Sequence, residues 1–185
     1  MTSNVKNVLM VGVGGQGTIL VSKIMATGLI EAGYDVKMSE VHGMSQRGGS
    51  VSTQIRYGEK VYSPIIGHGQ ADILVAFETM EALRSLKYLK PDGIAVVNEY
   101  EIPSAPILMG QLDYPENILE QIKSKVNTSS IKAAEIAKEL GNPRVMNVVL
   151  LGALVKGMKL TDINWEKAIR ENMKAQMVDI NLKAF

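Results

Sequence analysis

The segment that most constrains the fold lies near the start of the chain. The apolar run at 6–13, KNVLMVGV, passes directly into the glycine-rich sequence GVGGQG and then into a helical pattern over 18–32. A continuous apolar run is typical of a strand buried on both faces of a parallel sheet. Gly33 is placed to end the helix. This order of strand, tight turn and helix predicts the first unit of an α/β fold.

The same alternation continues through the middle of the chain. Strands are expected at 35–41, 51–57, 71–77 and 93–100, with a helix over 78–90 that Pro91 stops. The segment VSTQIRYG alternates apolar and polar residues, and the Gly58-Glu59 pair after it suits a two-residue turn, with 60–64 returning antiparallel. These patterns predict a Rossmann-like, mostly parallel sheet with helices on both faces and an added antiparallel hairpin.

From about residue 115 the pattern becomes helical. Helices are expected over roughly 115–125, 129–140, 144–158 and 164–178, and Asn164 is placed to cap the last of them. The sequence contains no internal repeat, low-complexity tract or linker. We therefore expect one domain, residues 1–185, with a helical C-terminal third.

Composition excludes several classes of function. The 185 residues carry a net charge of +1, which argues against a large nucleic-acid footprint. The chain has no cysteine, which excludes disulfides, thiolate-bound zinc and cysteine-held iron–sulfur clusters within it. No apolar run approaches the roughly 18 residues that a membrane helix needs, and the N-terminus does not read as a signal peptide. We expect a cytoplasmic protein that binds no membrane.

The first turn matches a known anion-binding pattern. Gly12, Gly14 and Gly17 satisfy G-x-G-x-x-G, in which glycines let the backbone tighten and let an anion approach the amides at a helix start. Glu40 ends the next expected strand, about where a ribose-binding carboxylate would lie in a dinucleotide fold. The other interpretation is a tight turn with close helix packing. Gln16 inside the turn and the absence of a substrate domain weaken the dinucleotide interpretation.

The second glycine-rich segment contains an arginine. In SQRGG, Arg47 is followed by Gly48 and Gly49, so a planar guanidinium adjoins bare backbone amides. That combination suits a phosphate or carboxylate. A loop with a solvated arginine remains the alternative.

Other candidate sites are weaker. His42 and His68 are the only histidines, and their spacing does not indicate a metal site. Neither Ser45 nor Ser50 lies in a G-x-S-x-G nucleophile motif. No residue is therefore singled out as catalytic.

Four segments taken together resemble one family along most of the chain. They are GVGGQG, HGMSQRGG, FETMEALR and NVVLLGAL, in that order. The family is that of the gamma-type subunits or domains of the 2-oxoacid:ferredoxin oxidoreductases. The histidine-containing HGMSQRGG is most similar to the indolepyruvate:ferredoxin oxidoreductase branch.

The resemblance implies a shared activity. In that family thiamine diphosphate and 4Fe-4S clusters belong to a large alpha subunit, which also passes electrons to ferredoxin, and coenzyme A takes the acyl group as co-substrate. This chain would bind no cofactor alone and would be inactive alone. The site residues implied are Gly12, Gly14, Gly15, Gln16, Gly17, Arg47, Gly48 and Gly49, lining a cleft shared with the large subunit.

The sequence leaves open whether the two glycine-rich loops contact coenzyme A or only the partner subunit. The apolar helix at 18–32 and the helical C-terminal third fit a protein that another chain covers. A stand-alone enzyme that binds NAD or flavin, and a nucleotide- or coenzyme A-binding module without catalysis, remain the alternatives.

Overall fold

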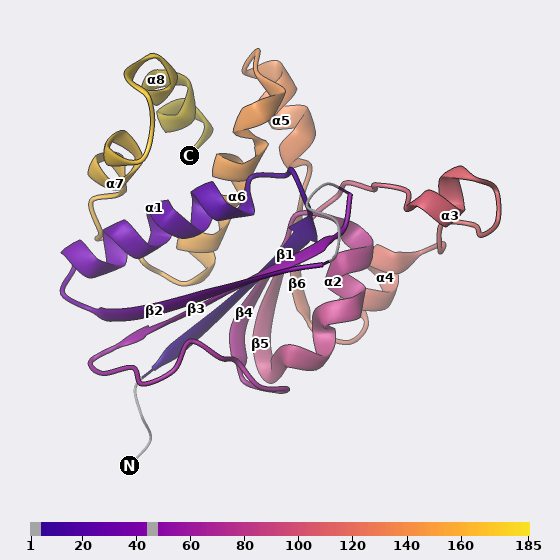
Figure 1. Ribbon diagram of the computed structural model, residues 1–185, viewed down its shortest axis with the longest axis horizontal. Helices are drawn as coiled ribbons and strands as arrows, with labels where there is room; N and C mark the ends of the chain where they lie inside the picture. Colours follow the sequence, from indigo (N-terminus) through magenta and orange to yellow (C-terminus); the bar gives the residue numbers. More distant parts are fainter. Residues whose placement is uncertain (1–4, 44–47) are drawn as a thin grey trace.

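A computed structural model describes residues 5–43 and 48–185. Within these ranges the strands form one sheet in the order β2-β3-β1-β4-β5-β6 (Figure 1). The strands are β1 (Lys6–Val13), β2 (Asp35–His42), β3 (Ser50–Gly58), β4 (Ala71–Ala76), β5 (Leu89–Asn98) and β6 (Asn127–Ile131). The α-helices are α1 (Thr18–Glu31), α2 (Thr79–Ser85), α3 (Ala105–Leu108), α4 (Ile118–Lys123), α5 (Ala133–Glu139), α6 (Met146–Gly157), α7 (Trp165–Glu171) and α8 (Ala175–Ala184).

The sheet is mostly parallel, as predicted. β1, β4, β5 and β6 pair in parallel, while β3 runs antiparallel to both β1 and β2. Side chains of β1 alternate between the two faces: Val8 and Met10 enter one core, and Leu9 and Val11 enter the other. Helices α1 and α5 to α8 cover the first face, and α2 and α4 cover the second (Figure 1).

The antiparallel hairpin lies elsewhere than expected. It is formed by β2 and β3, with Asp35 opposite Gly58, so the glycine-rich segment after residue 42 is its connection. Residues 60–64 form no strand and instead lie along the second face of β3. Arg56 donates hydrogen bonds to the carbonyl oxygens of Ser63 (2.9 Å) and Ile65 (3.3 Å). These side-chain bonds satisfy backbone groups that a strand ladder would otherwise pair.

The apolar helix α1 is covered by this chain itself. The indole of Trp165, on α7, is 3% exposed and lies against Gly28, where an added Cβ would come within 2.7 Å of the ring. Helices α6 and α7 thus cover much of α1, while its Ile19 and Ile30 stay 40% and 59% exposed. The sequence analysis took this apolar helix to fit a protein that another chain covers. An apolar helix surface has the same composition whether its cover is intramolecular or intermolecular, so composition alone did not distinguish the two.

Three further elements differ from their predictions. A strand, β6, occupies 127–131 and so takes the first residues of the helix predicted over 129–140, which begins instead at Ala133. Its sequence NTSSI is polar because it is an edge strand with limited burial. The helix expected over 164–178 divides at Lys174, whose backbone is extended. Pro91 lies inside β5, beside a register irregularity that leaves room for a residue without an N–H, and the helix ends earlier, at Ser85.

The predicted cap of α7 is confirmed. The side-chain oxygen of Asn164 accepts a hydrogen bond from the backbone N–H of Lys167 (3.1 Å). Within the described ranges, no helix is long and apolar enough to cross a membrane.

Candidate functional site

The turn between β1 and α1 needs its glycines for different reasons. Gly15 and Gly17 have φ angles of 104° and 82°, in the left-handed region that disfavours residues with a Cβ. Gly12 has an ordinary φ, but a Cβ there would lie 2.8 Å from Gln16 Oε1 and 2.9 Å from the Cβ of Phe77. The motif therefore encodes both backbone conformation and close packing.

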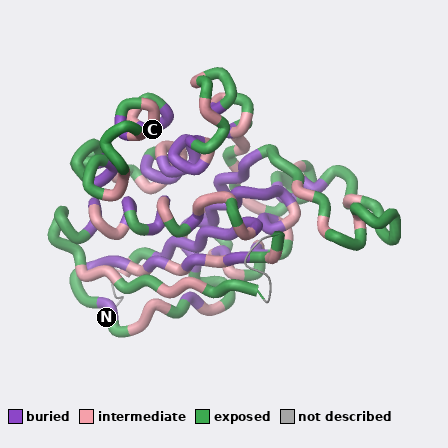
Figure 2. The backbone as a smooth tube through the Cα atoms, turned by 45° about the horizontal axis from the view of Figure 1, so that its top comes forward, coloured by how far each residue is buried: buried purple, intermediate pink, exposed green. Residues whose placement is uncertain are grey.

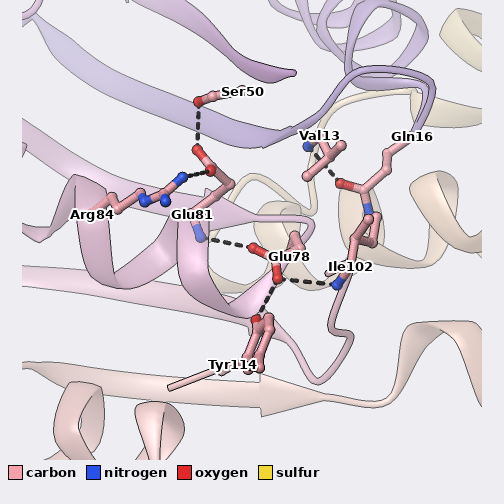
Figure 3. A network of polar contacts seen from close by, with 8 residues as sticks. All are labelled: Val13, Gln16, Ser50, Glu78, Glu81, Arg84, Ile102 and Tyr114. Atoms are coloured by element: carbon pink, nitrogen blue, oxygen red, sulfur yellow. Dashed lines mark hydrogen bonds and ion pairs between the residues drawn. The ribbon is translucent and has the colours of Figure 1, made fainter. Parts of the chain in front are cut away.

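Gln16 holds the turn together. Its Oε1 accepts a hydrogen bond of 2.8 Å from the backbone N–H of Val13 (Figure 3). Its Nε2 donates another of 2.8 Å to the carbonyl oxygen of Phe77. The side chain thus ties the turn to the residue that follows β4. Gln16, the polar residue that weakened the dinucleotide interpretation, therefore has a structural role. The oxygen and the nitrogen of its side-chain amide each form a hydrogen bond with the backbone of this chain.

The two glycine-rich segments meet in space. The N–H of Gly14 donates to the carbonyl oxygen of Gly49 (2.8 Å), and the N–H of Gly48 donates to the carbonyl oxygen of Gly14 (3.3 Å). Arg47 lies outside the described residues, which leave out 44–47, so the structure positions only the glycines of that motif. The predicted clustering of the two loops is visible in these backbone contacts.

An ion pair on α2 fixes the start of β3, directly after this loop. Ser50 Oγ donates to Glu81 Oε2 (2.5 Å), and the Arg84 guanidinium donates to Glu81 Oε1 (2.8 Å) (Figure 3). Glu81 is 5% exposed, and these two partners offset the cost of burying its charge.

A second buried carboxylate, Glu78, was not singled out by the sequence analysis. Its side chain is 1% exposed and caps α2 by accepting from the backbone N–H of Glu81 (2.8 Å). It also accepts from the N–H of Ile102 (3.2 Å) and the hydroxyl of Tyr114 (2.5 Å) (Figure 3). Burial, followed by this hydrogen bond to Glu78, raises the pKa of Tyr114 above its ordinary range. The available signal was an acidic residue between a buried strand and a helix, repeated three positions later.

A pocket of about 600 Å³ opens beside the first turn. Its walls include Gly14 to Gly17, Tyr100 and Ile102 after β5, Arg144 in the short turn before α6, and Asn147 at the start of α6. The pocket therefore lies at the carboxyl ends of parallel strands, where α/β folds commonly bind ligands.

The electrostatics of this pocket favour an anion. Among the described residues no side chain caps the N-terminus of α1, and its first turn holds no acidic residue. Open N–H groups and the helix dipole give that end a partial positive charge. The exposed guanidinium of Arg144 adds a full positive charge at the pocket. Asn147 donates from Nδ2 to the carbonyl oxygen of Gly17 (3.3 Å), and its buried Oδ1 has no partner within the described part of the chain.

Glu40 does not join this site. It lies on β2, which β3 separates from β1, and its carboxylate accepts from Ser22 Oγ (3.3 Å). In a dinucleotide fold the ribose-binding carboxylate follows a strand adjacent to the glycine turn. Because the antiparallel strand β3 lies between them, Glu40 is not in the position next to the glycine turn that the dinucleotide interpretation requires. In the described ranges no three His, Asp or Glu side chains gather as metal ligands.

Comparison with known proteins defines the class. Residues 7–185 match the family model described as pyruvate ferredoxin/flavodoxin oxidoreductase, and the chain belongs to that family. It is similar to the indolepyruvate oxidoreductase subunit IorB of Pyrococcus horikoshii, with 39% identity over 97% of this chain and 92% of that protein. The corresponding subunit of Archaeoglobus fulgidus is also 39% identical, over 96% of this chain and 90% of the relative. The family resemblance stated from the sequence is confirmed.

Solved structures share the fold. The gamma subunit of a keto/oxoacid ferredoxin oxidoreductase from Geobacter sulfurreducens superposes with a TM-score of 0.71 at 25% identity, covering 97% of this chain and 93% of that one. The 2-oxoglutarate:ferredoxin oxidoreductase of Magnetococcus marinus, solved with 2-oxoglutarate, coenzyme A and succinyl-CoA bound, gives 0.74 at 23% identity. That match covers 98% of this chain but only 30% of the longer one.

Proposed function

We propose that this chain is the small subunit of a 2-oxoacid:ferredoxin oxidoreductase that acts on indolepyruvate or another aryl pyruvate. The observation that carries the proposal is the near-complete coverage, at up to 39% identity, of relatives named as indolepyruvate oxidoreductase subunits. The reaction is oxidative decarboxylation of the 2-oxoacid in the presence of coenzyme A. It yields acyl-CoA and carbon dioxide, and the electron pair released passes to ferredoxin.

Following the family resemblance, we assign the 4Fe-4S clusters, thiamine diphosphate and the contact with ferredoxin to a large alpha subunit. The absence of cysteine from this chain fits that division, because the clusters need thiolate ligands. Thiamine diphosphate, when bound there, supplies the carbanion chemistry of decarboxylation. We place the complex in the cytoplasm.

The contribution of this chain is a wall of the shared cleft that binds an anionic group. The backbone of Gly14 to Gly17 and the open end of α1 favour the phosphates of coenzyme A or a substrate carboxylate, and Arg144 adds charge. We assign the same role to Arg47, on the strength of its sequence motif. Gly12, Gly48, Gly49 and Gln16 shape the backbone around that anion, and none of these residues is catalytic.

An anaerobic assay of the purified subunits tests the proposal. The small chain, the large chain and their mixture are each supplied with indolepyruvate, coenzyme A, thiamine diphosphate and a viologen acceptor. We expect viologen reduction by the mixture alone, and we expect it to require coenzyme A. Reduction without coenzyme A, or none with the assembled pair, would contradict the proposal. Micromolar binding of NAD or FAD by the isolated chain would support the stand-alone alternative instead.

A further inference from the structure

Among the described residues, one segment after β5 projects outward (Figure 1). It comprises residues 99–117, leaves the sheet after β5, carries the short helix α3 and returns to α4. Figure 1 shows it reaching outward beyond α2 and α4, and Figure 2 shows that most of it is exposed. We call residues 99–117 the arm.

The tip of the arm is apolar. Leu108, Met109 and Leu112 are 74%, 71% and 62% exposed. Single exposed apolar side chains are common on soluble proteins and need no explanation. Three large ones within five residues, at the end of a projection, form a surface of the kind that another molecule covers.

Carboxylates lie along both sides of the arm: Asp113 and Glu116 follow the tip on the returning side, and Glu99 and Glu101 lie at the base of the outgoing side. Glu99, Glu101, Asp113 and Glu116 are exposed, and residues 91–122 contain no lysine, arginine or histidine. In the described ranges none of these four carboxylates forms an ion pair with a basic side chain. The arm therefore presents an apolar tip, and we call the carboxylates along its two sides its acidic rim.

The base of the arm is held firmly. Both of its sides bond to Glu78, one through the N–H of Ile102 and the other through the hydroxyl of Tyr114. Thr79 adds hydrogen bonds from its N–H (3.0 Å) and its Oγ1 (2.9 Å) to the carbonyl oxygen of Tyr100. An arm anchored in this way loses less conformational entropy on binding than a loose loop would.

We propose that the tip of the arm docks into an apolar groove rimmed by lysine or arginine on the large subunit of the oxidoreductase. This inference rests on the proposed function, which supplies that subunit. Charge complementarity selects the occupant. A second copy of this chain docked tip to tip would bring two acidic rims together, which repel, and an anionic lipid surface would repel the rim as well.

The arm also borders the anion pocket. Tyr100 and Ile102 line that pocket, and they are fixed by the same Thr79 and Glu78 that hold the arm. A partner docked on the tip would therefore lie on the side of the domain where the pocket opens.

The test is the affinity between separately purified small and large subunits, measured by calorimetry. The double variant Leu108→Asp, Leu112→Asp removes apolar contact and adds charge at the tip. We expect its dissociation constant to rise at least about 30-fold, the effect of losing a binding hot spot. Its matched control is Ile65→Asp, which changes a side chain that is 56% exposed on the loop before β4 and should bind within about 3-fold of wild type.

A charge variant gives an independent measurement. Asp113→Lys with Glu116→Lys should slow association, and the wild-type affinity should fall as sodium chloride rises from about 50 to 500 mM. Both sets of side chains are exposed, so the thermal midpoint of each isolated variant should stay at the wild-type value.

Three results would overturn the inference. The first is a tip double variant that binds the large subunit within about 3-fold of wild type. The second is a charge variant that associates as fast as wild type. The third is a wild-type chain that dimerises alone through Leu108 and Leu112. Failure of the proposed function gives a different result, an assembled wild-type pair that does not oxidise any 2-oxoacid.

Discussion

The backbone N–H of Gly14 donates a 2.8 Å hydrogen bond to the carbonyl oxygen of Gly49. This bond joins two loops that lie far apart in the sequence, one ending β1 and the other leading into β3. Because β3 pairs directly with β1, both loops emerge at the same end of the sheet. The second loop therefore braces the first, which lines the pocket through Gly14 to Gly17, and changes in either loop should affect the other.

Gly17→Ala should lower the free energy of unfolding by more than about 2 kcal/mol, because left-handed strain is joined by a steric clash. The new Cβ would collide with the side-chain amide of Asn147. Gly15→Ala is the control, since Gly15 shares the positive φ but has open space around it, and it should cost about 1–2 kcal/mol. Urea denaturation measures both. Equal losses would show that the Asn147 contact is unimportant.

Gln16→Ala should destabilise the chain by about 1–3 kcal/mol, because the N–H of Val13 loses its partner. The carbonyl oxygen of Phe77 keeps a second bond, from Asn98 Nδ2 (3.1 Å), so the loss on that side is smaller. Gln111→Ala, an exposed position on the arm, serves as control and should change stability by less than about 0.5 kcal/mol. A Gln16 variant as stable as wild type would contradict the structural role of this side chain.

Arg47→Ala should raise the apparent Michaelis constant for coenzyme A in the assembled enzyme. Loss of a charged hydrogen bond costs about 1.5–3 kcal/mol, which is roughly 10- to 150-fold in the specificity constant. Arg47→Lys should recover only part, because lysine keeps the charge but not the planar fork. Steady-state kinetics at saturating small subunit separates this from a docking defect, which would disappear there.

Arg144→Ala tests an arginine that the structure places at the pocket. It should weaken coenzyme A in the same direction, by a smaller factor of about 3–10, because Arg144 is exposed and its charge is screened. The control is Arg170→Ala, whose guanidinium already pairs with Glu166 (2.7 Å) on α7. Unchanged kinetics for both Arg47→Ala and Arg144→Ala would contradict the anion-binding role of this pocket.

Tyr114 should make the fold sensitive to alkali. Its pKa is raised in the folded chain by burial and then by Glu78, so the folded state holds the proton longer than the unfolded state does. The stabilisation is complete below the ordinary tyrosine pKa of about 10 and is lost as pH rises above it.

The measurement compares urea denaturation at about pH 8 and pH 11. Tyr114→Phe should lose stability less steeply than wild type over that interval. Some slope should remain, because burial also raises the pKa of Tyr57. Tyr62→Phe, at a side chain that is 90% exposed, should retain the wild-type slope, and a Tyr114 variant with that same slope would contradict the account.

Sequence patterns predicted the elements that depend on local signals. The apolar run of β1, the glycine turn and the Asn164 cap each carry their cause in adjacent residues. The predicted position of the antiparallel hairpin was wrong. Gly58 and Glu59 match the pattern of a two-residue turn, but the hairpin forms between β2 and β3, whose connection is longer. β6 was missed because an edge strand needs few apolar residues.

The backbone of the candidate site could be predicted from the sequence, but the side-chain hydrogen bonds that hold its surroundings could not. The glycines could be identified from their sequence motifs, and their two loops were expected to lie close together in the fold. Glu78 was missed because its partners, Ile102 and Tyr114, are more than twenty residues away and only the fold unites them. The ribose-binding role considered for Glu40 was wrong for the converse reason. Its spacing in the sequence suits a dinucleotide site, but β3 lies between β2 and β1 in the sheet.

The most direct test of the central claim is a subunit titration. The large subunit is held constant under anaerobic conditions with indolepyruvate, coenzyme A and a viologen acceptor, and the small chain is added in steps. The account predicts viologen reduction that starts near zero and rises to a plateau at a fixed molar ratio of small to large chain. Full activity before any small chain is added, or turnover by the small chain alone, would contradict it.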